Sequence, residues 1–134
     1  MKILALDYGS ARTGVAVSDP TGTLARPLTI VARAGTDAGL AELVRLIGAE
    51  SAERVVVGLP LTMRGEHGEQ ARETEAFVEA LRQATDVPVE TFDERFTTDL
   101  AERFSAGDPR SPSDARAAAH LLSGYLAWSS APRS

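Results

Sequence analysis

Two short apolar runs open the chain on either side of a glycine-rich segment, and this feature restricts the fold more than any other. Ile3–Leu6 and Val15–Val17 have the length and composition of buried strands. Gly9–Gly14, between them, has the small and polar residues of a tight turn. The pattern predicts an antiparallel hairpin, with Asp7 at the end of its first strand.

The rest of the chain alternates between helix and strand signals. A third strand is expected over Leu24–Ala34, where Pro27 indicates a sheet edge or an irregularity. Strands over 54–58 and 87–92 are expected among helices that begin near 36, 69, 97 and 113. The order predicts an α/β fold, in which a mixed five-stranded sheet has three antiparallel strands first, then two parallel strands, and is flanked by helices.

Three of the expected helices have apolar residues at helical spacing, which predicts the face that each packs on the sheet. These predicted inner positions are Leu40, Leu43, Val44 and Ile47 in the first helix, Ala76, Phe77, Ala80 and Leu81 in the second, and Asp114, Ala117, Ala118, Leu121, Leu122 and Tyr125 in the last.

Length and composition restrict the classes of protein to consider. A chain of 134 residues, 43% hydrophobic, is expected to form one domain over residues 1–134 with a real core. No apolar run approaches the ~20 residues that cross a bilayer, and no secretory leader is visible, so a cytoplasmic location is expected. The absence of cysteine excludes disulfides, thiolate zinc sites and a cysteine nucleophile. A net charge of −5 argues against indiscriminate phosphate binding over the whole surface, but not against a local basic patch.

Acidic residues stand at the ends of three predicted elements. Asp7 follows the first strand, Asp93 and Glu94 follow the fifth, and Asp114 begins the last helix. Each also has an ordinary interpretation as a turn residue, a solvated pair or a helix cap. Because sites in such sheets lie beyond the carboxyl ends of strands, the carboxylates can also converge. Oxygen ligands favour Mg²⁺ or Mn²⁺, and two such ions ~3.5–4 Å apart suit phosphodiester hydrolysis.

Basic and hydroxyl residues neighbour these positions and are candidates for contact with substrate phosphates. They are Ser10, Arg12, Thr13, Arg64, His67, Arg95 and Arg116. Ordinary surface or turn roles are the alternative for each of them. Neither His67 nor His120 has a second histidine at ligand spacing, so a zinc pair is not expected. Tyr125 and Trp128 are interpreted first as core or interface anchors.

Taken together, four segments resemble the YqgF family of Holliday junction resolvase-like proteins and pre-16S rRNA nucleases. They occur in the family's order over nearly the whole chain. The segments are Leu6–Gly9 with Gly14–Ala16, Val57–Leu61 with Gly65, Asp93–Thr98, and Asp114 with Ala117, Ala118, Leu121 and Leu122.

This resemblance implies a ribonuclease H-like fold and metal-dependent cleavage of phosphodiester bonds. By motif, Asp7, Glu94 and Asp114 become the catalytic and metal-binding triad, with Asp93 as an auxiliary. The wider resolvase pattern has its second carboxylate at the end of the fourth strand, where this chain has Gly58–Pro60. Glu94 must then reach the site from the neighbouring strand.

The leading interpretation is a cytoplasmic nuclease, dependent on Mg²⁺ or Mn²⁺, that trims the 5′ end of precursor 16S rRNA. Its expected partners are nucleic acid and the ribosomal subunit, with no membrane, and it is expected to act as a monomer or a homodimer. Two alternatives stay open. One is a DNA nuclease that acts on branched junctions, and the other is a non-catalytic RNA-binding assembly factor.

Overall fold

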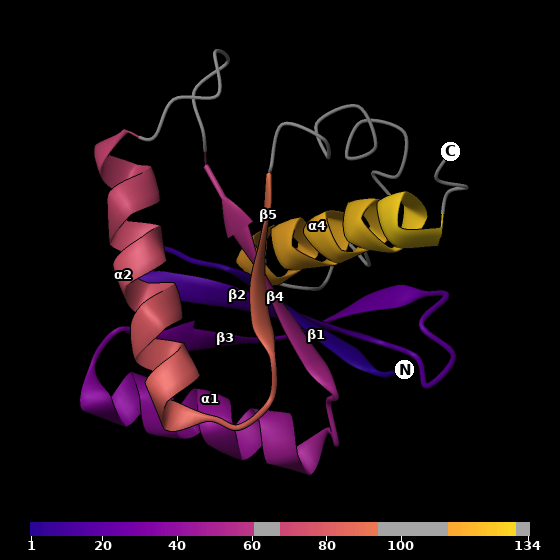
Figure 1. The fold of residues 1–134 in the computed structure, drawn as a ribbon, viewed down its shortest axis with the longest axis horizontal. Coiled ribbons are helices and arrows are strands. Elements are labelled where there is room, and N and C mark those ends of the chain that lie inside the picture. The colour runs from indigo at the N-terminus through magenta and orange to yellow at the C-terminus, as the bar shows by residue number, and fades with distance from the viewer. Residues whose placement is uncertain (61–67, 94–112, 131–134) are drawn as a thin grey trace.

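The computed structural model describes residues 1–60, 68–93 and 113–130 and shows a single mixed sheet with helices on both faces (Figure 1). The five strands lie in the order β3-β2-β1-β4-β5. The predicted division into three antiparallel strands followed by two parallel strands is confirmed.

The first three strands form the expected meander. β1 (Ile3–Asp7) pairs antiparallel with β2 (Arg12–Ser18), which pairs antiparallel with β3 (Ala25–Ala32). The ladder between β2 and β3 shifts so that Val15 faces Thr29 while Ala16 faces Pro27. Pro27 therefore marks both the irregularity and the edge position that its missing N–H favours.

The second half of the sheet is parallel because helices return the chain to the same edge. α1 (Asp37–Ala49) leads to β4 (Arg54–Leu59), and α2 (Glu69–Ala84) leads to β5 (Val89–Asp93). β4 pairs with β1 and β5 pairs with β4, so the carboxyl ends of β1, β4 and β5 share one edge. β4 and β5 both end at the top of the view in Figure 1.

Two hydrophobic clusters fill the two faces of the sheet. α1 and α2 cover one face, where Leu4, Leu6 and Val57 are fully buried. α4 (Ser113–Ser130) covers the other face and packs on Ile3, Ala5 and other residues of the opposite strand parity (Figure 1). This alternation along β1 fixes which way each later side chain of the strand points.

The helix faces differ in part from those predicted. Ala76 and Ala117 are exposed, while Leu46, Val78 and Leu126 are buried. Alanine counts as apolar in a sequence pattern, but its small side chain does not have to be buried. The predicted inner faces therefore differ by one or two positions from the faces that pack on the sheet. The third strand also ends at Ala32 rather than at residue 34, because Arg33 turns the backbone out of the sheet.

The helix expected to begin at Thr97 or Thr98 lies outside the described residues, and so does the polar loop expected over Thr62–Gly68, except for Gly68 itself. Within residues 1–60, 68–93 and 113–130, no helix combines the length and the apolarity needed to cross a membrane.

Candidate active site

The carboxyl edge of the sheet brings together side chains from distant parts of the sequence. Asp7 is the last residue of β1, and Asp93 is the last residue of β5. The register, which pairs Leu6 with Val57 and Leu59 with Asp93, places both acidic residues at this edge. Both are partly buried. Ligand sites in such sheets lie where parallel strands end, which makes this edge the candidate site.

Asp114 reaches the same edge on α4. A Cβ built on Gly14 would lie 1.8 Å from the carbonyl oxygen of Asp114, so the first turn of α4 rests directly on the β2 backbone at Gly14. Gly14 is also the register partner of Asp7. The structure thus brings Asp7 and Asp114, 107 positions apart in the chain, to one place beside Gly14.

The side chains of Asp7 and Tyr8 lie on opposite faces of the sheet. Tyr8 stacks on Phe77 of α2, with 4.3 Å between ring centroids. Asp7 shares the parity of Ala5, which packs under α4, so its side chain leaves the sheet on the same face as Asp114. In β5, Phe92 packs on that α4 face. Asp93 therefore has the opposite parity, which argues against the auxiliary role predicted for it.

Arg12 lies beside Asp114. Its Nε is 3.4 Å from Oδ2 of Asp114, and the two side chains are 69% and 36% exposed. Ser10 is also exposed in the turn between β1 and β2. Thr13 differs from the prediction, because it is fully buried and its hydroxyl exchanges hydrogen bonds of 3.4 Å with the N–H and C=O of Gly9. Thr13 holds the turn instead of offering a hydroxyl to substrate.

Arg116 stands in the first turns of α4 with a half-buried side chain. Its Nε is buried and has no hydrogen-bond partner within the part of the chain that the structure describes. A buried N–H without an acceptor is unfavourable by ~1–3 kcal/mol, so Arg116 is a candidate to gain a hydrogen-bond acceptor that the described residues do not supply. His120, one turn further on, is half-buried, as predicted for a helix residue.

The remaining predicted site residues are outside the described residues. They are Glu94, Arg64, His67 and Arg95. No group of three acidic, histidine or cysteine side chains close enough to hold a metal ion occurs within residues 1–60, 68–93 and 113–130. Asp7 and Asp114 offer carboxylate oxygens only, and such a donor set fits Mg²⁺ or Mn²⁺ rather than a softer metal.

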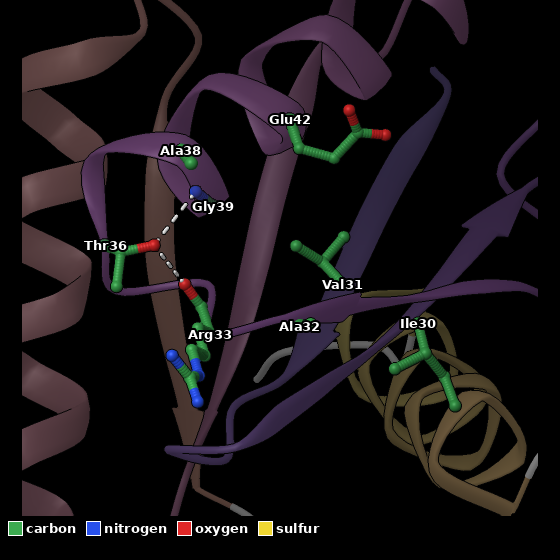
Figure 2. Close-up of a pocket in the computed structure, with 8 residues that line it drawn as sticks. All are labelled: Ile30, Val31, Ala32, Arg33, Thr36, Ala38, Gly39 and Glu42. Carbon is green, nitrogen blue, oxygen red and sulfur yellow. Dashed lines mark hydrogen bonds between the residues drawn. The ribbon is translucent and has the colours of Figure 1, made fainter.

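Beside this edge, the end of β3 and the start of α1 enclose a shallow pocket of about 550 Å³ (Figure 2). It is lined by Ile30, Val31, Ala32, Arg33, Thr36, Ala38, Gly39 and Glu42. Arg33 is not among the residues predicted from the sequence to form the site. Only the register that pairs Ala32 with Arg12 brings Arg33 to the hairpin turn, and a single sequence carries no signal of that register.

Comparison with known proteins identifies the family and the fold. Residues 1–128 match the sequence model of the RuvX family, described as "Holliday junction resolvase". A relative from Chloroflexus aggregans (strain MD-66 / DSM 9485) is 48% identical over 101 residues, which is 75% of this chain and 71% of the relative. Another, from Anaeromyxobacter sp. (strain Fw109-5), is 44% identical over 132 residues, covering 94% and 96%. Both are named "Putative pre-16S rRNA nuclease".

Solved structures show the same fold. Thermus thermophilus RuvC in complex with a Holliday junction substrate superposes with a TM-score of 0.67 at 17% identity, over 96% of this chain and 94% of that chain. The fowlpox virus Holliday junction resolvase gives a TM-score of 0.53 at 13% identity, over 96% and 99%. The ribonuclease H-like fold predicted from the sequence is thereby confirmed. With its sequence matched over residues 1–128, the chain belongs to the RuvX family.

Proposed function

We propose that the chain is a divalent-metal-dependent nuclease that processes the 5′ end of precursor 16S rRNA. The observation that carries this proposal is the gathering of Asp7 and Asp114 beside Gly14, at the carboxyl edge of a sheet shared with RuvC. The choice of RNA substrate follows the names of the relatives, and the ribosomal subunit is the corresponding partner. Two carboxylates on one face of this edge are an arrangement suited to phosphodiester chemistry.

Asp7, Glu94 and Asp114 would hold Mg²⁺ or Mn²⁺. Glu94 is included on the sequence motif alone, because it lies outside the described residues. When bound, one or two such ions supply an activated water and charge neutralisation at the scissile phosphate. The chain itself would place Asp7 from a buried strand and Asp114 from the first turn of a helix packed on that strand's partner.

Substrate contact is assigned to the basic residues around the carboxylates. Arg12 projects from the hairpin beside Asp114, and Arg116 presents a buried N–H without an acceptor among the described residues. Ser10 is exposed in the same turn. Arg64, His67 and Arg95 join them on the sequence evidence alone. Guanidinium groups suit this role because they bind phosphate oxygens in pairs.

The test is cleavage of a labelled RNA that carries the 5′ precursor segment of 16S rRNA, with Mn²⁺ or with chelator. Wild type should cut only with the metal, while Asp7→Asn and Asp114→Asn should lose at least about a hundredfold in rate. Asp86→Asn is the matched control, because Asp86 is exposed before β5 at the opposite edge. Equal rates for wild type and Asp7→Asn would remove Asp7 from the mechanism.

A second candidate is resolution of branched DNA, which the description of the family favours. Matched RNA, single-stranded DNA and four-way junctions separate the two candidates when offered at equal concentration. Symmetric cutting of a junction also needs two sites, so light scattering of the complex should then show a dimer. If no substrate is cut but RNA is bound, the protein acts as a non-catalytic assembly factor.

A further inference from the structure

Arg33 has a backbone conformation that normally favours glycine. Its φ is +47°, and among the described residues only Ser51, with a φ of +54°, is another non-glycine residue with positive φ. A side chain in this region is unfavourable by roughly 1 kcal/mol, and such residues cluster at functional sites. The conformation alone assigns no role, but it raises the question of what the Arg33 side chain does.

Hydrogen bonds hold the backbone of Arg33 in place from both sides. Its N–H donates to the carbonyl of Ala11 in the hairpin turn, at 3.0 Å. Its carbonyl accepts from the N–H of Thr36 at 3.0 Å and from the Thr36 hydroxyl at 2.7 Å (Figure 2). A Cβ on Gly39 would lie 2.2 Å from the same carbonyl, so the first turn of α1 also packs against it. The side chain of Arg33 therefore starts from a fixed point.

That fixed point lies on the edge that carries the candidate active site. β3 runs parallel to β1, and Ala32 pairs with Arg12, so Arg33 continues the edge beyond the hairpin turn. β2 lies between β1 and β3, so the backbones of β1 and β3 are two strand spacings apart, or about 10 Å. A nucleic-acid strand bound at the carboxylates can span this separation, so a nearby backbone phosphate can reach the turn that holds Arg33.

The charge of Arg33 is available for a ligand. The residue is exposed, and within the described ranges no salt bridge uses its guanidinium. Glu42, which lines the same pocket, is paired with Arg45 instead. Figure 2 shows the Arg33 guanidinium and the Glu42 carboxylate on opposite sides of the pocket residues.

We propose that Arg33 binds a backbone phosphate of the nucleic acid, on the strand that is cut but beyond the scissile bond itself. The nucleic-acid strand would run from Asp7 and Asp114 across the exposed residues Ser10 to Arg12. It would contact Arg33 at the turn between β3 and α1. This inference rests on the proposed function, because it needs a nucleic acid bound at the carboxylates. It explains why a side chain occupies a backbone position better suited to glycine.

Two variants separate this binding role from a structural one. Arg33→Gln removes the charge but keeps a side chain at a backbone position with positive φ. Arg33→Gly removes both the charge and the unfavourable conformation. The midpoint of thermal unfolding should stay unchanged for Arg33→Gln and should rise by up to about 4 °C for Arg33→Gly. Both should bind a short fluorescently labelled single-stranded RNA about tenfold more weakly, measured without cleavage in chelator.

The salt dependence of binding gives an independent readout. For one lost phosphate contact, the slope of log affinity against log salt should become shallower by about 0.7. A single-stranded DNA of the same sequence should show the same loss, because the contact is to phosphate. Ser51→Gly is the matched control, since Ser51 has the same backbone conformation between α1 and β4, away from the site edge. It should be as stable as wild type or more so, and bind RNA equally well.

The outcomes distinguish the two proposals. If wild type binds neither RNA nor DNA, the proposed function fails. If wild type binds and both Arg33 variants bind as tightly with the same salt slope, the Arg33 contact is overturned while the nuclease proposal stands.

Discussion

Asp7 and Asp114 are ordinary carboxylates whose proposed chemistry comes from where their backbones are held. Asp7 ends a strand whose preceding four residues are buried, so its side chain begins at the boundary between the core and solvent. Asp114 lies in the first turn of α4, where the helix dipole favours negative charge. Within the described part of the chain, Arg12 forms an ion pair with Asp114. At the candidate site, this guanidinium would compete with a bound cation for the Asp114 carboxylate.

Replacing Arg12 tests that competition. Arg12→Ala should bind Mn²⁺ up to about fivefold more tightly, because exposed ion pairs contribute ~0.2–1 kcal/mol and this one would no longer oppose the ion. The same variant should bind RNA more weakly. Titration calorimetry with Mn²⁺ measures the first effect, and Arg26→Ala, an exposed arginine near Glu50, is the control. Unchanged or weaker Mn²⁺ affinity would contradict the competition.

A second residue-scale prediction concerns Asp19 in the turn after β2. Hydrogen bonds from the Thr21 hydroxyl, then from the N–H groups of Leu24 and Thr23, lower the pKa of Asp19 from 3.8 to about 2. Because the folded pKa is below the unfolded one, this contribution to stability is present above pH 3.8 and is lost as the pH falls toward 2. Carboxyl NMR should show titration near 2, and Thr21→Val should move the midpoint back toward 3.8.

At the scale of elements, the contact between α4 and β2 decides whether the site exists. Phe92 packs edge-on against Tyr125, with 5.6 Å between ring centroids, and Arg54 donates to the Tyr125 hydroxyl at 2.8 Å. Burial and the hydrogen bond to Glu90 raise the pKa of Tyr125. These contacts fix the second half of the helix, while Gly14 fixes its first turn.

Gly14→Ala should therefore move the start of α4 off the sheet. The new Cβ would overlap the Asp114 carbonyl and destabilise the protein by about 3 kcal/mol. Urea unfolding measures the loss, and RNA cleavage should fall with it because Asp114 is displaced. Gly48→Ala is the control, since no atom lies within 4 Å of its added Cβ and alanine suits a helix better. Equal stability of Gly14→Ala and wild type would show that the close packing is unimportant.

Element boundaries show what local sequence could and could not reveal. The hairpin, α1 and β4 were predictable because their apolar periods and turn residues are local signals. The exposure of Ala76 and the end of β3 at Ala32 were not, because both depend on contacts between distant segments. At the site, the family motif predicted Asp7, Glu94 and Asp114, and the roles of all three stay predictions. That Asp7 and Asp114 meet beside Gly14, under the first turn of α4, needed coordinates.

At the scale of the whole molecule, binding of a metal ion is coupled to folding, because the sheet holds the candidate ligands together. The candidate ligands come from β1, the segment after β5, and α4, so the site exists only when all three are assembled. A ligand that binds only the folded state stabilises it.

Mn²⁺ at about a hundred times its dissociation constant should thus raise the free energy of unfolding by ~2.7 kcal/mol. Thermal melts at increasing Mn²⁺ concentration measure this stabilisation. Asp7→Asn should lose most of it, while Asp86→Asn should retain it. A melting temperature that does not respond to Mn²⁺ in wild type would argue for the non-catalytic assembly factor.

The irregular hydrogen-bond ladder at β3 also affects how this protein associates with other copies of itself. β3 stands at the end of the strand order, where an unpaired strand can recruit a strand of another molecule. Pro27 offers no N–H, and the shift beside it inserts Leu28 out of step with β2. A neighbouring chain therefore cannot extend the sheet through a continuous ladder here. This irregular edge should weaken association of concentrated protein through pairing of β3 with β3 of another molecule.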